Sequence, residues 1–222
     1  MFSITDLWRE NHPGANVGCM VVRKVQNFAQ CERLEACKRK LEADLCQLFS
    51  SREQLSANSI IMRYEDYYKR YKKTYHVRQQ IETIVLKGKQ IPSIASLVEA
   101  MFMAELKNCL LTAGHDYDTL QMPLYIKVGT GNENYILFNG KEHPVKKGDM
   151  MIADTAGVIS SVIHGPDSRT RITQDTKKAL FIVYTPEGIP PQAVYNHLDD
   201  IYFYIKLFSP EAEIEMQQVY TA

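Results

Sequence analysis

Apolar residues recur at helical spacing through much of the first half of the chain. Between Asn27 and Ser50 they repeat every three or four positions, which predicts an amphipathic helix with Asn27 as a candidate cap. Similar patterns predict helices at residues 76–86 and 93–109, the second beginning after the helix-blocking Pro92. A Val-rich segment at 15–25 precedes them and predicts a strand.

In the second half, apolar and polar residues alternate, and residues typical of turns separate the alternating runs. The predicted strands are Leu124–Val128, Tyr135–Phe138, Met150–Ala153, Val158–Ile163 and Leu180–Tyr184. Asn139-Gly140 indicates a tight turn. Residues 190–207 return to a helical pattern, and the acidic tail after Ser209 is expected to be ordered only in part. This order predicts an α+β fold, with a mixed or antiparallel β-sheet covered by helices.

Composition narrows the class of protein. A length of 222 residues suits one large domain or two interlocked small ones, and we expect a single domain over residues 1–222. No apolar run approaches the ~18 residues of a membrane span. The first ten residues do not resemble a signal peptide, so the expected location is cytoplasmic. The five cysteines form no C-x-x-C pair, which predicts reduced thiols, no disulfide, no metal and no cofactor.

Positive charge gathers in one part of a chain whose formal net charge is zero. Residues 63–89 hold eight Lys or Arg against three Asp or Glu. Four tyrosines within this region lie at helical spacing and are expected to face the core: Tyr64, Tyr68, Tyr71 and Tyr75. The cations opposite them, Lys69, Lys72 and Lys73, are candidates for binding RNA phosphates. A simply solvated helix face is the alternative.

A polar cluster follows the helical segment that begins near Ile91. The small residues Thr112-Ala113-Gly114 predict a break, and His115-Asp116-Tyr117-Asp118 then predicts a turn with titratable side chains. Imidazole titrates near neutral pH, so His115 is the candidate that positions or deprotonates a water molecule. Asp116 or Asp118 would orient that ring or hold a substrate ammonium, and backbone N–H groups near Gly114 would stabilise an oxyanion. A solvated helix end is the alternative.

Two arginines form a second candidate group. In an extended strand Arg169 and Arg171 would point the same way, and paired guanidinium groups suit a phosphate or a carboxylate. Solvated charges on an edge strand, or an ion pair of Arg171 with Asp175, are the alternatives. The chain has no P-loop, dinucleotide fingerprint, nucleophile elbow or H-E-x-x-H motif, so its sequence supports no covalent nucleophile.

An ordered series of segments resembles the editing domain of the phenylalanyl-tRNA synthetase β subunit, whose two interlocked parts are called B-three and B-four. The segments are Ile94–Asp118, Phe138–Asp154 and Arg169–Val183. The resemblance is best over residues 85–184. The strand and helices of residues 15–84 and the helix at 190–208 are expected to pack on this part.

The resemblance implies binding of the 3′ end of tRNA or aminoacyl-tRNA and hydrolysis of a wrongly attached amino acid, with His115 at the position of the motif histidine. It implies an aminoacyl-tRNA deacylase acting in trans. We expect neither a DNA nor a membrane partner. The activation segments of the ligase have no counterpart, so a complete ligase is not expected. The chain departs from the synthetase at two sequence positions. Phe102 stands at about the place of an Asn of the synthetase, and the residue nearest to the place of its editing Glu is Arg169 or Arg171.

These departures keep two alternatives open. One is a non-catalytic module that binds tRNA or an amino-acid-like ligand. The other is a structural interaction protein that uses the basic, Tyr-rich helix.

Overall fold

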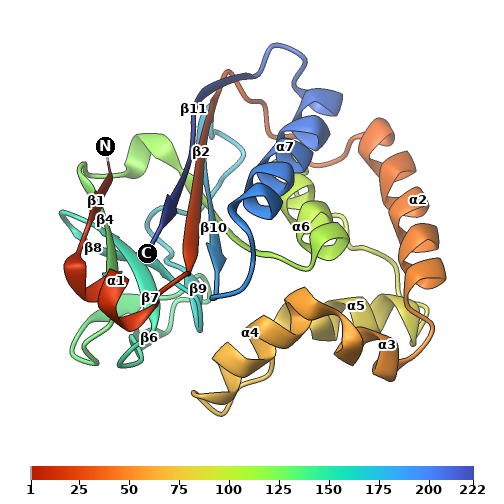
Figure 1. Ribbon diagram of the computed structural model, residues 1–222. Coiled ribbons are helices and arrows are strands. Elements are labelled where there is room, and N and C mark those ends of the chain that lie inside the picture. The colour runs from red at the N-terminus through yellow and green to blue at the C-terminus, as the bar shows by residue number, and fades with distance from the viewer. Residues whose placement is uncertain (1) are drawn as a thin grey trace.

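Two main β-sheets form the frame of the molecule, and the computed structural model describes residues 2–222 (Figure 1). The first sheet has the order β1 (Phe2–Ile4), β4 (Leu124–Val128), β7 (Met150–Asp154), β8 (Gly157–Ser161), β9 (Gly165–Pro166). The second has the order β11 (Glu213–Thr221), β2 (Asn16–Arg23), β10 (Lys178–Thr185), β3 (Leu111–Asp116). A small hairpin joins β5 (Asn134–Ile136) to β6 (Glu142–Pro144). Only the β1–β4 pair is parallel among the strand pairs of these residues, which confirms the predicted mixed α+β class.

Helices α6 (Ser96–Asn108) and α7 (Pro191–Phe208) pack beside the second sheet (Figure 1). Close approach is possible because Gly18 in β2 has no side chain. A Cβ atom there would lie 2.3 Å from Val194 Cγ1 of α7. The remaining helices are α1 (Asp6–Asn11), α2 (Glu32–Leu48), α3 (Arg52–Ala57), α4 (Ser59–Lys69) and α5 (His76–Val85), with a short 3-10 turn at Tyr117–Thr119. One cluster of buried apolar side chains extends through both sheets and the helices.

Most predicted helices and strands are confirmed, but α2 starts five residues later than expected. Its N-cap is Cys31, which lacks a side-chain capping bond. The predicted cap, Asn27, serves another helix instead, because its Oδ1 accepts a hydrogen bond of 3.0 Å from the Leu97 N–H in the first turn of α6. The sequence does not show which helix start lies beside Asn27 in space, and so it cannot show which helix this residue caps.

Residues 111–116 are a buried strand, so the predicted turn at the end of a long helix is wrong. Helix α6 stops at Asn108, and Cys109 adopts a left-handed backbone conformation (φ 56°) that redirects the chain. Strand β3 then pairs along β10. The small residues allow close packing here, since a Cβ on Gly114 would lie 2.8 Å from Ile172 and 3.1 Å from Met101.

The expectation of a partly ordered tail is also wrong, because β11 pairs with β2 over the length of that strand. Its acidic residues face cations. Glu213 forms ion pairs with Arg23 (2.7 Å) and Lys24 (2.6 Å), and Glu215 pairs with Lys178 (2.7 Å). Backbone pairing with a buried neighbour therefore orders a segment whose composition alone is polar.

Tyr64, Tyr68 and Tyr75 are buried and Tyr71 is half-buried, as expected, but they do not share one helix, because α4 ends at Lys69. The rings of Tyr64 and Tyr75 stack with centroids 4.3 Å apart. Tyr64 donates a hydrogen bond to the Tyr184 carbonyl, and Tyr68 donates one of 2.8 Å to the Val162 carbonyl. These bonds attach α4 to both sheets. No helix within residues 2–222 is both long and apolar enough to cross a membrane.

Candidate functional site

His115 is buried where the two sheets meet. Its side chain is fully buried in β3, at an edge of the second sheet. The Nδ1 atom lies 2.7 Å from Thr170 Oγ1, and the Nε2 atom lies 3.3 Å from Ser160 Oγ in β8 of the first sheet. The imidazole therefore joins the sheets through two hydroxyl groups.

The hydrogen-bond partners determine the tautomer of His115. Thr170 Oγ1 donates its proton to the Asp167 carboxylate, so it accepts one from His115 Nδ1–H. Nε2 is then unprotonated and accepts a hydrogen bond from Ser160 Oγ–H, which in turn accepts one from the Tyr184 hydroxyl at 2.5 Å. The donors all point along one chain, from Tyr184 to the carboxylate of Asp167.

The imidazole is neutral at pH 7. Burial and, less strongly, the nearby Arg169 cation together lower the pKa of His115 to about 3, against the smaller opposing effect of the Asp154 carboxylate. Because both ring nitrogens already bind hydroxyl groups, neither contacts solvent. In this conformation His115 positions Ser160 and Thr170.

Arg169 and Arg171 do not share one face of a strand, so that prediction is wrong. The chain bends at residues 168–170, where the Asp167 carboxylate accepts a 3.1 Å hydrogen bond from the Thr170 N–H. Arg169 turns inward and pairs with the buried Asp154 at 2.9 Å. Arg171 is exposed, bridges His115 through its backbone, and forms no ion pair with Asp175 or any other residue of the described chain.

The two aspartates after His115 do not orient its ring, contrary to expectation. Asp116 is buried, and its Oδ2 accepts a 2.6 Å hydrogen bond from Thr176. Its Oδ1 accepts one of 3.1 Å from the Asp118 N–H and caps the short turn that follows. Asp118 is exposed and free to meet a ligand. Gly114 is enclosed by side chains, and this packing accounts for a glycine there.

Several members of this buried network were not found from the sequence. They are Asp154, Ser160, Asp167, Thr170 and Tyr184. His115 is separated by 45 residues from Ser160 and by 55 from Thr170, and neither lies in a recognisable motif. The only available signal was the polar run around the two arginines, which contains Asp167 and Thr170.

The predicted RNA-binding lysines contribute to a larger cationic surface. We call it the basic surface: Arg70, Lys72, Lys73, Lys146 and Lys147, which are all exposed and have no ion pair within residues 2–222. Lys69 is exposed beside them but pairs with Asp66 at 3.2 Å.

Two observations indicate that the parts of the basic surface are near each other. Burial, then the charges of His143, Lys73 and Lys146, lower the pKa of His164 to about 4, so cations from both segments act on one imidazole. Tyr71 Oη lies 3.4 Å from the position that a Cβ of Gly148 would occupy. The end of α4 therefore meets the loop between β6 and β7.

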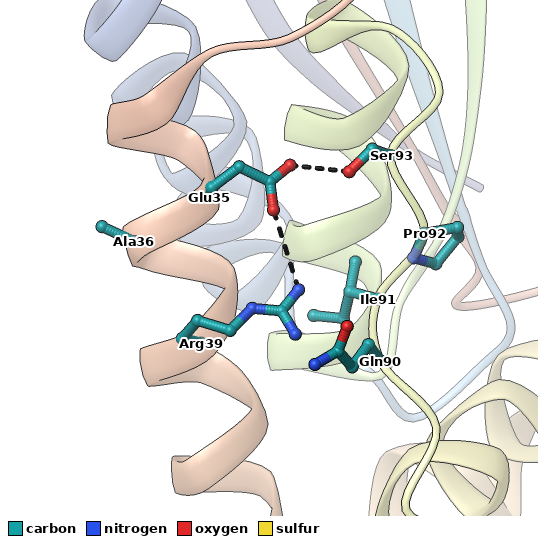
Figure 2. Close-up of a pocket in the computed structure, with 7 residues that line it drawn as sticks. All are labelled: Glu35, Ala36, Arg39, Gln90, Ile91, Pro92 and Ser93. Carbon is teal, nitrogen blue, oxygen red and sulfur yellow. Dashed lines mark hydrogen bonds and ion pairs between the residues drawn. The ribbon is translucent and has the colours of Figure 1, made fainter.

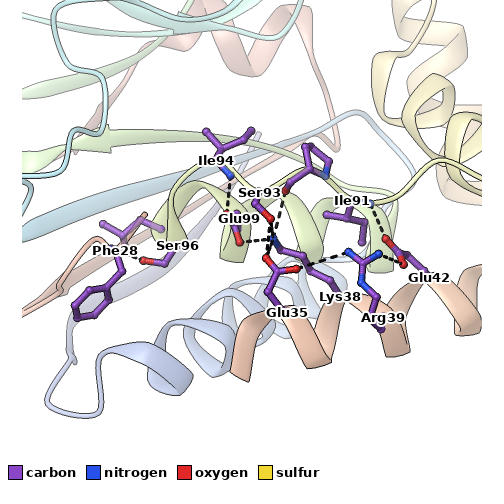
Figure 3. A network of polar contacts seen from close by, with 12 residues as sticks. Phe28, Glu35, Lys38, Arg39, Glu42, Ile91, Ser93, Ile94, Ser96 and Glu99 are labelled. Atoms are coloured by element: carbon purple, nitrogen blue, oxygen red, sulfur yellow. Dashed lines mark hydrogen bonds and ion pairs between the residues drawn. The ribbon is translucent and has the colours of Figure 1, made fainter. Parts of the chain in front are cut away.

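A second polar cluster surrounds Lys38 on α2, beside a pocket of about 550 Å³ (Figure 2). The fully buried Lys38 ammonium pairs with Glu35 at 2.6 Å and Glu99 at 2.5 Å, and donates to Ser93 Oγ at 3.0 Å (Figure 3). Glu99 also accepts a 2.6 Å hydrogen bond from the Ile94 N–H. These bonds satisfy the buried groups and hold the loop before α6 against α2, so we interpret the cluster as a structural clamp.

Comparison with known proteins places this architecture in a family. The family model described as the B3/4 domain matches residues 63–198. A solved N-terminal fragment of the phenylalanyl-tRNA synthetase β subunit from Pyrococcus horikoshii shares the fold, with a TM-score of 0.51 and 11% identity. That alignment covers 100% of this chain but 54% of the fragment, so the chain spans about half of its length. No curated protein matches. Because the matched residues make up more than half of the chain and contain the entire network around His115, the chain belongs to the B3/4 domain family.

Proposed function

We propose that this chain binds the aminoacylated 3′ end of tRNA and hydrolyses the ester of a wrongly attached amino acid in trans. Family membership supports a tRNA-related role, since the similar solved fragment belongs to a tRNA synthetase subunit. The observation that carries the proposal is the basic surface, which lies beside the segment that leads into the His115 network. The cations of Lys73 and Lys146 act on the pKa of His164, whose backbone N–H donates a 3.3 Å hydrogen bond to Ser161 Oγ, next to Ser160.

The basic surface suits an RNA backbone. None of its five cations forms an ion pair with a carboxylate in the described chain. An RNA phosphate would therefore not have to displace a carboxylate to bind them. Arg171, whose backbone pairs with that of His115, adds an exposed side chain that would hold a terminal phosphate. Asp118, which is also exposed, would hold the ammonium of the attached amino acid.

In the proposed reaction, a water oxygen bonds to the ester carbonyl carbon and the bond from that carbon to the ribose oxygen breaks. The proton lost by water goes to the ribose oxygen, and the products are free amino acid and tRNA. The neighbouring ribose hydroxyl assists this transfer, because His115 is buried and its Nε2 lone pair is occupied by Ser160. His115 is a positioning residue in this scheme.

The same burial favours a second candidate, a module that binds aminoacyl-tRNA without hydrolysis. A general base must lie within hydrogen-bond reach of the proton it removes. Both nitrogens of His115 are bound to protein hydroxyls, and its low pKa makes it a weak base.

A deacylation assay separates the two candidates. Purified protein is incubated with a panel of mischarged tRNAs and release of the amino acid is measured, while filter binding is measured in parallel. Turnover that Arg171→Ala lowers, and Lys89→Ala leaves unchanged, supports the hydrolase. Binding without turnover on every tRNA supports the module. An absence of both binding and turnover overturns the two candidates.

The role of the basic surface has its own control. The triple variant Lys72→Ala, Lys73→Ala and Lys146→Ala is compared with a matched triple variant at Lys40, Lys87 and Lys89, which are exposed and free of ion pairs in residues 2–222. The slope of log affinity against log salt is expected to fall by roughly 2 in the first variant, at about 0.7–0.9 for each lost phosphate contact. Equal slopes in the two variants would show that RNA binds elsewhere.

A further inference from the structure

An apolar groove of about 340 Å³ lies between α2 and α7, and its lining shares no residue with the His115 network. Leu41 and Leu45 of α2 line it with buried side chains. Two large apolar side chains of the groove are open to solvent, since Leu48 of α2 is 59% exposed and Phe203 of α7 is 56% exposed. Helix α2 lies on the outer side of the molecule, so a partner can approach it (Figure 1). Apolar surface gathered in one groove favours contact with another molecule.

The groove-lining residues of α2 form one stripe along that helix. They recur every three or four positions, as the residues of one helix face do: Cys37, Lys40, Leu41, Asp44, Leu45 and Leu48. Apolar residues occupy both ends of the stripe, and one charged residue lies on either side of its centre. The stripe therefore keeps nearly the same pattern when the direction of the helix is reversed, with the two charges exchanged.

The two charges of the stripe have no partners in the described chain. Lys40 and Asp44 are both exposed, and neither forms an ion pair within residues 2–222. A partner that fits the groove would carry a negative charge opposite Lys40 and a positive charge opposite Asp44. A second α2 helix that runs in the antiparallel direction carries these charges in that order.

The register of such a pair follows from helix geometry. When two antiparallel α2 helices cross at the level of Glu42, Lys40 of each copy lies at the level of Asp44 of the other. Like charges then lie about 6 Å apart along the axis, because a helix rises about 1.5 Å per residue. Leu48 of each copy lies close to the level of Cys37 of the other, at the opposite end of the groove. Two-fold symmetry forms both ion pairs at once.

We propose that the groove between α2 and α7 binds a second copy of this chain, with the two α2 helices antiparallel about a two-fold axis. Lys40 of each copy pairs with Asp44 of the other, and Leu48 and Phe203 of each copy cover the groove of the other. The formal net charge of zero allows two copies to approach without overall repulsion. This inference does not depend on the proposed hydrolysis, and the basic surface takes no part in it.

Analytical ultracentrifugation of the full chain tests the proposal. Sedimentation equilibrium is expected to show monomer and dimer with a dissociation constant below about 1 mM, and no larger species, because a two-fold interface is closed. A chain that stays monomeric at about 1 mM, or that forms species larger than a dimer, would overturn the proposal.

Charge reversal tests the orientation of the two copies. Lys40→Glu and Asp44→Lys each place like charges at both contacts and are expected to weaken dimerisation about tenfold or more. An equimolar mixture of these two variants restores opposite charges and should dimerise again. Lys89→Glu and Asp175→Lys change the net charge by the same amounts at exposed residues outside the groove, and neither alone nor mixed should they alter the dissociation constant. A groove-variant mixture no more dimeric than its separate components would contradict the proposal.

Apolar substitutions complete the test. Leu48→Ser and Phe203→Ser each remove an exposed apolar side chain from the groove and are expected to weaken dimerisation about tenfold. The matched controls Ile136→Ser and Phe138→Ser change exposed apolar residues outside the groove and should leave dimerisation unchanged. Urea unfolding of the four variants checks that each remains folded. Dimerisation that survives in both groove variants, or is lost in both controls, would contradict the proposal.

Discussion

The Nδ1 atom of His115 lies 2.7 Å from the Oγ1 atom of Thr170, and the Thr170 hydroxyl donates onward to Asp167. This pair determines which ring nitrogen carries the proton. It also joins β3 of one sheet to the segment that follows β9 of the other. His115, whose residue type indicates chemistry, is therefore held by the hydroxyl of Thr170, which no sequence motif identifies.

Removing that hydroxyl should destabilise the protein. In Thr170→Val the Nδ1–H of His115 is buried without an acceptor, which is expected to lower the free energy of unfolding by about 1–3 kcal/mol. Thr170→Ser keeps the hydroxyl and should lose less. Urea unfolding at pH 7 measures both variants. Equal loss in the two would mean that packing of the threonine methyl, and not the hydrogen bond, matters here.

The two arginines are predicted to differ in their effect on stability. Arg169→Ala leaves the fully buried side chain of Asp154 with only backbone donors, and we expect a loss of about 1–3 kcal/mol. Arg171→Ala removes an exposed, unpaired side chain and should change stability by no more than about 0.5 kcal/mol. Denaturant midpoints measure both. A larger loss in Arg171→Ala would show an interaction that the structure lacks.

The clamp on α2 should depend on charge balance. Lys38→Met leaves Glu99, which is also buried, without its cation, and this should cost about 3–5 kcal/mol. Adding Glu99→Gln removes the stranded charge while keeping an acceptor for the Ile94 N–H, so the double variant should recover part of the loss.

An exposed ion pair provides the control for the clamp. Arg9→Ala breaks a pair with Asp6 at the surface, and the expected cost is about 0–1 kcal/mol. Thermal and urea unfolding of the three variants and the wild type measure these differences. A double variant no more stable than Lys38→Met would contradict an electrostatic origin.

Glu105 should make stability depend on pH. It is buried in α6, and burial raises its pKa to about 8, although a hydrogen bond from the Thr112 N–H works in the opposite direction. The folded chain therefore keeps a proton that the unfolded chain loses above its ordinary pKa of 4.5. This contribution to stability is complete below pH 4.5 and is lost as pH rises to about 8, at up to about 1.4 kcal/mol per pH unit.

Glu105→Gln isolates this effect. Gln stays uncharged and still accepts from Thr112, so its stability relative to the wild type should increase between pH 5 and pH 8. Urea unfolding of both proteins at the two pH values gives the comparison. Parallel pH dependence in the two proteins would mean that Glu105 is ionised throughout.

Periodicity predicted the helices and strands in which the apolar residues themselves show which face is buried. Strands β2 and β10 and helices α5 and α7 belong to this group. Strand β3 and strand β11 do not, because their small or polar residues carry no clear alternation. They become strands by pairing their backbones with β10 and β2, which lie far away in the sequence.

For the candidate site, the sequence determined which residues have useful chemistry: His115, Asp118, the two arginines and the lysines at the end of α4. Only the tertiary structure decided that the imidazole is buried and neutral, that Arg169 turns inward while Arg171 stays free, and that lysines from two segments form one surface. The physical reason is that spacing along a chain determines local periodicity, whereas burial and hydrogen-bond partners depend on segments that folding brings together.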